Sequence, residues 1–160
     1  MQADFVASLF CSIKCDEKLG RLTTFVDSNG HATRDVWDRL LPVMDGAMID
    51  LKAIDSDTHE EMTGKPNHLV LDTIRYLAEW GRLWEVRLLM VPGRNDSPEV
   101  VATTAEWLRN IDPSIRVKLI GFRQNGVRPQ FANIPEADPA HIAELAEVIR
   151  NAGIKKLVVV

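Results

Sequence analysis

The sequence predicts an α/β domain built on a parallel sheet. Short apolar segments that suit strands alternate with longer segments in which apolar residues recur every three or four positions, as on one face of a helix. This alternation is typical of parallel strands joined by helical crossovers. The strand segments are nearly continuous apolar runs, as expected of strands buried on both faces. Residues 1–160 are expected to form a single domain, because 160 residues of which 46% are hydrophobic suit one core.

The expected elements follow one another along the whole chain. They are a helix over 2–18, a strand over 22–27, a helix over 33–42, a strand over 47–51, a helix with an apolar stripe over 70–78, a strand over 84–91, a helix after Ser97, a strand over 115–122, a helix around 142–149 and a strand over 157–160. Thr33 is the expected N-cap of the second helix, and Ser97 followed by Pro98 forms a favoured helix start. The irregular stretch 121–139 is expected to lie over one end of the sheet.

Five strands leave the architecture open between two alternatives. A closed eight-stranded (β/α) barrel needs about 250 residues. The chain is therefore either an open doubly wound sheet or an incomplete part of a larger barrel.

Charge and composition exclude several classes of protein. Nineteen Lys and Arg against twenty-three Asp and Glu give a net charge of -4, which argues against a nucleic-acid binder. No apolar run approaches the roughly 20 residues that cross a bilayer, and the N-terminus has no basic segment typical of a secretory signal. Two cysteines cannot build a disulfide framework, so a cytoplasmic location is expected.

Charged residues stand at the carboxyl ends of the predicted strands, where parallel α/β proteins bind their ligands. Asp27 ends the first strand, and Arg87 interrupts the third. Asp50 and Lys52 end the second strand on the same side as Met48, because side chains alternate with period two. An acid and a base at this spacing suit a zwitterionic group, with its carboxylate on Lys52 and its ammonium or hydroxyl on Asp50. Alternatively, these polar residues cap the following helices or are simply solvated.

Four short segments in a fixed order carry a family resemblance. They are Val26-Asp27-Ser28-Asn29-Gly30, Met48-Ile49-Asp50-Leu51-Lys52, Thr63-Gly64-Lys65-Pro66-Asn67-His68 and Val91-Pro92-Gly93-Arg94-Asn95-Asp96. From about residue 20 onward the chain resembles the C-terminal part of radical S-adenosylmethionine (SAM) activating enzymes of glycyl radical enzymes, the pyruvate formate-lyase activating enzyme family.

That resemblance implies a fold, two cofactors and a partner. The fold would be a partial (β/α) barrel of six units, of which this chain holds an incomplete piece of about five strands. SAM would lie across the strand ends, and a [4Fe-4S] cluster would reduce it to methionine and a 5′-deoxyadenosyl radical. The partner, a glycyl radical enzyme of the pyruvate formate-lyase class, would lose a hydrogen atom from a glycine.

The resemblance also implies site residues. Asp50, Leu51 and Lys52 match the strand that contacts SAM. Asp27 matches a residue near the methionyl end of SAM and, in some members, near a monovalent cation shared with Asp50 and Met48.

The remaining implied contacts concern adenosine. Leu89 and Ile120 match apolar contacts to it. Arg123 stands where many members have a histidine that reaches the ribose, and a guanidinium can donate there as well. No residue of the chain is assigned a catalytic role.

Two family motifs are missing from the chain. The family ligates its cluster with three cysteines spaced C-x3-C-x2-C and has a Gly-Gly-Glu-Pro segment that holds the SAM amino group. Cys11 and Cys15 have the first spacing, but no third cysteine follows and both fall in a predicted helix. Because two thiolates are too few for a cluster, we expect no metal site here. We interpret the chain as a fragment or truncated form that begins behind these motifs and expect it to be inactive alone.

Two other functional interpretations remain at this point. One is a self-contained small α/β ligand-binding module without radical chemistry, which would be a monomer with a closed pocket. The other is a different SAM-dependent or aldolase-type barrel, disfavoured because no Schiff-base lysine or glycine-rich nucleotide loop stands out. A partial barrel would expose a sheet edge at 22–27, so that interpretation predicts self-association there.

Overall fold

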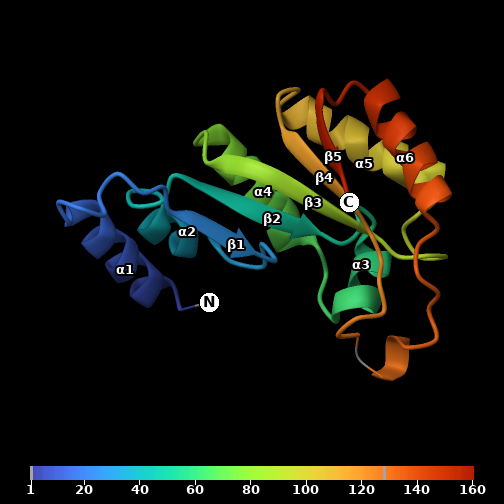
Figure 1. Ribbon diagram of the computed structural model, residues 1–160, viewed down its shortest axis with the longest axis horizontal. Helices are drawn as coiled ribbons and strands as arrows, with labels where there is room; N and C mark the ends of the chain where they lie inside the picture. Colours follow the sequence, from blue (N-terminus) through green and yellow to red (C-terminus); the bar gives the residue numbers. More distant parts are fainter. Residues whose placement is uncertain (1, 128) are drawn as a thin grey trace.

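The computed structural model describes residues 2–127 and 129–160 and contains one five-stranded parallel sheet (Figure 1). The strands lie in chain order: β1 (Phe25–Ser28), β2 (Gly46–Leu51), β3 (Leu83–Met90), β4 (Arg116–Gly121) and β5 (Lys156–Val159). The α-helices are α1 (Ala3–Cys15), α2 (Arg34–Leu40), α3 (Ser56–Thr63), α4 (His68–Glu79), α5 (Pro98–Ile111) and α6 (Pro139–Asn151). A short 3-10 turn, η1 (Pro129–Phe131), lies in the segment between β4 and α6.

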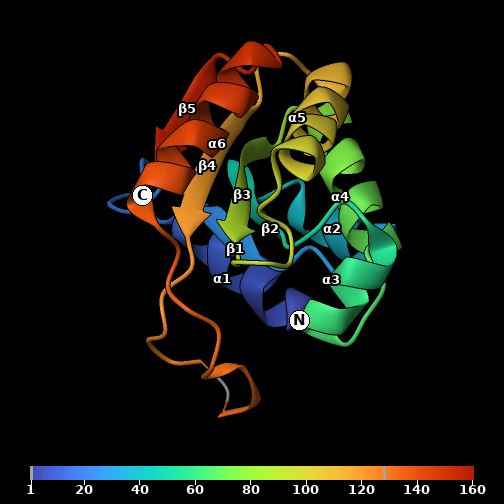
Figure 2. The same cartoon turned by 90° about the vertical axis from the view of Figure 1, so that its right-hand side faces the viewer.

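The sequential strand order decides between the two architectures. Every crossover steps in the same direction across the sheet, and right-handed crossovers then place their helices on the same face. A doubly wound sheet would instead reverse its strand order and carry helices on both faces. Figure 2 shows α2, α4, α5 and α6 following one side of the sheet. The fold is therefore an arc of a (β/α) barrel, as the resemblance implied.

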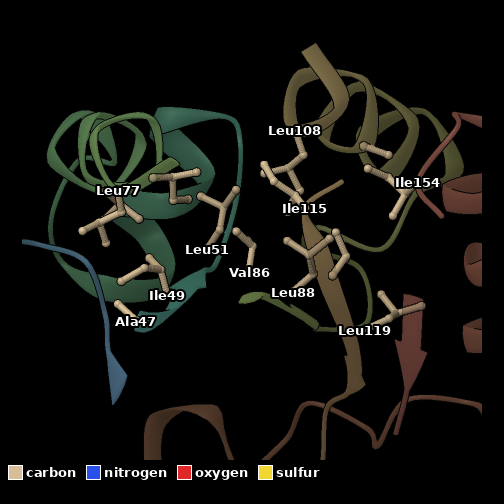
Figure 3. Close-up of a cluster of buried hydrophobic side chains, with 14 of the residues drawn as sticks. Ala47, Ile49, Leu51, Leu77, Val86, Leu88, Leu108, Ile115, Leu119 and Ile154 are labelled. Carbon is tan, nitrogen blue, oxygen red and sulfur yellow. The ribbon is translucent and has the colours of Figure 1, made fainter. Parts of the chain in front are cut away.

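The helix-covered face of the sheet holds the hydrophobic core (Figure 3). Ile49 pairs in register with Val86, and Leu88 pairs with Leu119, so these side chains form rows that cross the sheet. All four are buried, and Leu77 of α4 packs into the same cluster. Burial of this apolar surface under the helices is the main force that holds the layers together.

Among the described residues, no second layer of helices covers the opposite face of the sheet. Strand β2 alternates between buried and half-buried residues from Ala47 onward, and β3 does so from Val86 onward. Met48, Arg87 and Leu89 are half-buried on this uncovered face. The expectation that both faces are buried was therefore wrong. The reason is that apolar residues such as Met48 and Leu89 also stand on the uncovered face. Their presence makes each strand a continuous apolar segment in the sequence, although only one of its faces is buried.

Element boundaries agree with the sequence pattern except where side chains intervene. Helix α1 ends at Cys15 rather than 18, because the Asp16 carboxylate accepts the N–H groups of Lys18 and Leu19. Strand β1 begins at Phe25 rather than 22, and the N–H of Thr24 donates to the Asp45 carboxylate at 2.6 Å.

The predicted helix caps give one success and one correction. Ser97 accepts from the N–H of Val100, with Pro98 at the first helical position, as predicted. Thr33 occupies the N-cap position of α2, but its hydroxyl donates to Asp35 and caps no backbone group. None of the described helices is long and apolar enough to cross a membrane.

Candidate functional site

A cavity lies at the carboxyl ends of the strands, where residues of α3 and of the described stretches 122–127 and 129–138 between β4 and α6 (orange in Figure 1) line it together with the sheet. Its larger compartment has a volume of about 640 Å³ and a mixed lining, with the polar side chains of Asn29, His31, Asp50, Lys52 and Lys65 beside apolar ones such as Val70, Leu89 and Phe131. A smaller, mainly apolar compartment of about 150 Å³ adjoins it and is lined by Met62, Leu89, Val91, Phe122, Val127, Phe131 and Ile134, among others. Lys52 and Leu89 border both compartments. The cavity therefore suits a ligand with one polar end and one apolar end.

The acid–base pair predicted at the end of the second strand is present in this cavity. Lys52 Nζ lies 2.9 Å from Asp50 Oδ2, and both side chains are about 30% exposed (29% and 30%). Asp50 lies on β2, and Lys52 follows its last residue on the same face. A ligand that brought its own carboxylate and ammonium could therefore replace this internal pair with two intermolecular ones.

Asn95 joins the ends of β2 and β3 beneath the cavity. Its side-chain Nδ2 donates to the carbonyl oxygens of Lys52 and Leu89 at 2.5 and 2.7 Å. Its Oδ1 accepts from the N–H of Val91 at 2.7 Å, and the residue is 2% exposed. Sequence reasoning missed this role. The available signal was an amide residue just after a Pro-Gly turn that follows a buried strand.

Asp27 takes part in a chain of ion pairs on the uncovered face. Arg87 Nη1 lies 2.7 Å from Asp27 Oδ2, and Arg87 Nε lies 3.0 Å from Glu85 Oε1. Arg116 Nε contacts the second oxygen of Glu85 at 2.8 Å, and Arg87 Nη2 also lies 3.0 Å from the sulfur of Met48. Burial disfavours the Arg87 charge, but its hydrogen bonds to Glu85 and Asp27 outweigh this and raise the Arg87 pKa above its ordinary value. Asp27, Asp50, Lys52 and Arg87 thus share one face, on which Asp50, Lys52 and Met48 were predicted to lie together.

Glu85 is the member of this chain that the sequence analysis missed. Its side chain is only 6% exposed, although it belongs to an otherwise apolar strand. A buried carboxylate requires partners, and the two arginines supply them. A single acidic residue within an apolar strand was the signal that could have revealed it.

Of the predicted residues Leu51, Leu89, Ile120 and Arg123, only Leu89 lines the cavity. Leu89 lines both compartments, and Ile120 is its register partner on β4, half-buried outside the cavity lining. Leu51 is 1% exposed and packs in the core under the helices, so only its backbone is available to a ligand. Arg123 is exposed beyond the end of β4 and does not line the cavity.

The two cysteines lie away from this cavity. Cys11 and Cys15 are exposed on α1 and border a shallow groove with Ala7 and Val43. A hydrogen bond with the Cys11 thiol raises the pKa of Cys15. In the part of the chain that the structure describes, no three His, Cys, Asp or Glu residues are placed to hold a metal ion.

Comparison with known proteins identifies homologues. The chain is 32% identical over 129 residues to pyruvate formate-lyase 1-activating enzyme of Escherichia coli (strain K12), a match that covers 79% of this chain and 50% of that protein. It is 26% identical over 151 residues to 4-hydroxyphenylacetate decarboxylase activating enzyme of Clostridioides difficile (strain 630), covering 89% and 47%. The chain thus spans about half the length of these curated relatives. No protein-family model matches it.

Solved structures share the fold. A domain of pyruvate-formate lyase-activating enzyme from Bacteroides vulgatus superposes with a TM-score of 0.78 at 19% identity, covering 99% of this chain and 91% of that one. A radical SAM methyltransferase from Sphaerobacter thermophilus gives 0.73 at 21% identity, covering 94% and 44%. Taken with the sequence matches, these findings favour the family interpretation over that of an unrelated binding module. The chain is therefore a homologue of part of the activating enzymes of glycyl radical enzymes, represented by those for pyruvate formate-lyase and 4-hydroxyphenylacetate decarboxylase.

Proposed function

We propose that this chain supplies the SAM-binding part of a protein that activates a glycyl radical enzyme of the pyruvate formate-lyase class. The observation that carries the proposal is the Asp50–Lys52 pair on the wall of a cavity that also has an apolar compartment. SAM has a zwitterionic amino-acid end and an aromatic base, so its two ends match the two compartments. The homology to activating enzymes points to the same ligand.

The types of residue that line the cavity support this proposal. Lys52 would hold the methionyl carboxylate and Asp50 the ammonium group, since each supplies the opposite charge. Leu89 would contact the adenosine from the apolar compartment, with Ile120 beside it on β4. When bound, SAM supplies the 5′-deoxyadenosyl group needed for hydrogen abstraction from a glycine.

The other predicted residues would act at the margins of this site. Asp27, held by Arg87, would place a carboxylate beside the methionyl end. Leu51 would contribute its backbone, and Arg123 would reach the ribose only by swinging in from its exposed position beyond β4.

The residues present do not fit a [4Fe-4S] cluster. Such a cluster needs thiolates at several corners, whereas this chain has two cysteines, both exposed on α1 and away from the cavity. We therefore expect anaerobic reconstitution with iron and sulfide to leave the chain without stoichiometric iron. Iron and labile sulfide assays on the repurified protein measure this, and four equivalents of each would contradict it.

Binding of SAM to the chain tests the proposal directly. Titration calorimetry or NMR should show binding weaker than micromolar, because the chain offers neither a cluster nor the Gly-Gly-Glu-Pro segment. Lys52→Met and Asp50→Asn should each weaken binding by about tenfold, the effect of losing one hydrogen bond to a charged group. Lys155→Gln, an exposed control between α6 and β5, should change nothing. Absence of SAM binding, or binding that is indifferent to Lys52 and Asp50, would refute the proposal.

A further inference from the structure

The stretch of backbone that follows β2 carries Lys52 but belongs to no regular element. Strand β2 ends at Leu51, and α3 begins only at Ser56. Neither a strand ladder nor a helix therefore supplies donors to the carbonyl groups in between. Because backbone carbonyls near the core need hydrogen-bond donors, other parts of the fold must provide them.

Two asparagine side chains hold three successive carbonyl groups of this stretch. Asn95 Nδ2 donates to the carbonyl of Lys52 at 2.5 Å. Asn67 Nδ2 donates to the carbonyls of Ala53 and Ile54 at 3.2 and 2.8 Å. Asn95 comes from the turn before α5, and Asn67 from the start of α4. Segment 52–54 is thus tied to two neighbouring parts of the fold.

Both asparagines are spent on this task and are shielded from water. Asn95 is 2% exposed and Asn67 is 4% exposed. A buried amide cannot readily exchange its partner for water, so these hydrogen bonds fix the backbone firmly. Asn67 occupies the N-cap position of α4, where an asparagine side chain commonly accepts from the helix. It makes no such contact here, because its side chain serves segment 52–54 instead.

The position of segment 52–54 determines where the Lys52 ammonium can reach. Lys52 Nζ lies 2.9 Å from Asp50 Oδ2, and Lys52 lines both compartments of the cavity. A lysine side chain is long and flexible, so its charge is placed accurately only when the backbone at its base is fixed. A binding group that is held in this way also loses less freedom when the ligand arrives.

We propose that Asn67 and Asn95 are positioning residues that act through Lys52 on the carboxylate of SAM. This inference rests on the proposed function, in which Lys52 holds that carboxylate. Neither asparagine lines either compartment of the cavity, so neither is assigned a contact with SAM. Asn67 is the cleaner of the two to test, because Asn95 also bonds to Leu89 and Val91.

A double-mutant cycle tests this proposal. SAM binding is measured by NMR titration for Asn67→Ala, for Lys52→Met and for the double variant. Asn67→Ala alone should weaken binding about threefold, a part of the roughly tenfold loss expected for Lys52→Met. In the Lys52→Met background Asn67→Ala should cause no further loss, because the ammonium that Asn67 positions is gone. Asn110→Ala, which changes an exposed asparagine on α5, should leave SAM binding unchanged.

A second ligand separates positioning from a general loss of structure. 5′-Methylthioadenosine lacks the amino-acid end of SAM, so it should bind equally well to the wild type and to Asn67→Ala. Circular dichroism at the temperature of the titration shows whether each variant is folded. Should Asn67→Ala not fold, Asn67→Ser keeps a smaller hydrogen-bond donor and replaces it in the cycle, with a smaller loss of SAM binding expected.

The possible outcomes distinguish this inference from the proposed function. Unchanged SAM binding in the Asn67 variant would overturn the inference. So would a loss that persists in the Lys52→Met background or that extends to 5′-methylthioadenosine, since either result marks a purely structural effect. Failure of SAM to bind the wild type, or binding that is indifferent to Lys52→Met, would instead refute the proposed function and with it the role of both asparagines.

Discussion

Replacing Asn95 by alanine removes the side chain that ties β2 to β3 below the cavity. Three backbone groups lose their partner: the carbonyls of Lys52 and Leu89 and the N–H of Val91. A hydrogen bond contributes about 1 kcal/mol net, and a buried group left unsatisfied costs about 1–3 kcal/mol. Val91 is buried, whereas Lys52 and Leu89 are half-buried, so we count the full cost of an unsatisfied group only for the Val91 N–H. We therefore expect a loss of about 3 kcal/mol in the free energy of unfolding.

Urea unfolding followed by circular dichroism measures this loss. A drop of about 3 kcal/mol should lower the midpoint by roughly 1–2 M, given an m-value of about 2 kcal/mol/M for a small domain. Asn110→Ala provides the matched control, because Asn110 is exposed on α5 and its removal should change stability by less than about 0.5 kcal/mol. A loss below about 1 kcal/mol for Asn95→Ala, or one equal to that of the control, would refute the reasoning.

Asn95→Asp adds a test of hydrogen-bond direction. The substitution keeps one oxygen for the Val91 N–H but turns the second toward the carbonyls of Lys52 and Leu89, which are also acceptors. At neutral pH the variant should be at least as unstable as Asn95→Ala. It should recover partly below about pH 4, where a protonated carboxyl can again donate.

Three further predictions concern other parts of the fold. Leu119→Ala should lower the free energy of unfolding by about 2–5 kcal/mol, because this side chain is fully buried in the core; a loss under 1 kcal/mol in urea unfolding would contradict the packing described. His141 has a raised pKa, chiefly through its hydrogen bond to the Asp96 carbonyl, so its stabilising contribution is complete below its unfolded pKa of 6.5 and is lost as pH rises through the folded value. His141→Gln should therefore cost more stability at about pH 5.5 than at about pH 8.5, and equal costs would argue against this linkage. Among the described strands, β1 is paired only with β2, so we expect the chain to self-associate through the free edge of β1. Phe25→Lys should reduce this self-association, as measured by sedimentation velocity. A wild-type chain that remains monomeric at high concentration would contradict the prediction.

The order of strands and helices was readable from the sequence because both depend on local patterns. The apolar runs around Ile49, Leu88 and Leu119 predicted β2, β3 and β4, and Ser97 with Pro98 predicted the start of α5. Ends were less predictable where a distant side chain decides them. The N–H of Thr24, just before β1, donates to the carboxylate of Asp45, which is twenty-one positions away in the chain.

Part of the site could likewise be predicted. Asp50 and Lys52 were expected on one side of one strand end, since the period of a strand determines this, and their pairing follows from their charges. Asn95 and Glu85 escaped prediction, because their importance comes from groups on other strands that only folding brings near. The sequence also did not predict that Lys65 and His31 line the same cavity, because thirty-four positions separate them in the chain.

By itself, the sequence determined the alternation of strand and helix, the polar strand ends and the homology to activating enzymes, since each is recorded in neighbouring residues or in short segments. The tertiary structure alone decided that the helices lie on one face, that the other face is uncovered, and which side chains meet in the cavity. The physical reason is that strand order and crossover direction depend on how distant segments pack against one another. This packing is determined by the burial of the apolar core under the helices.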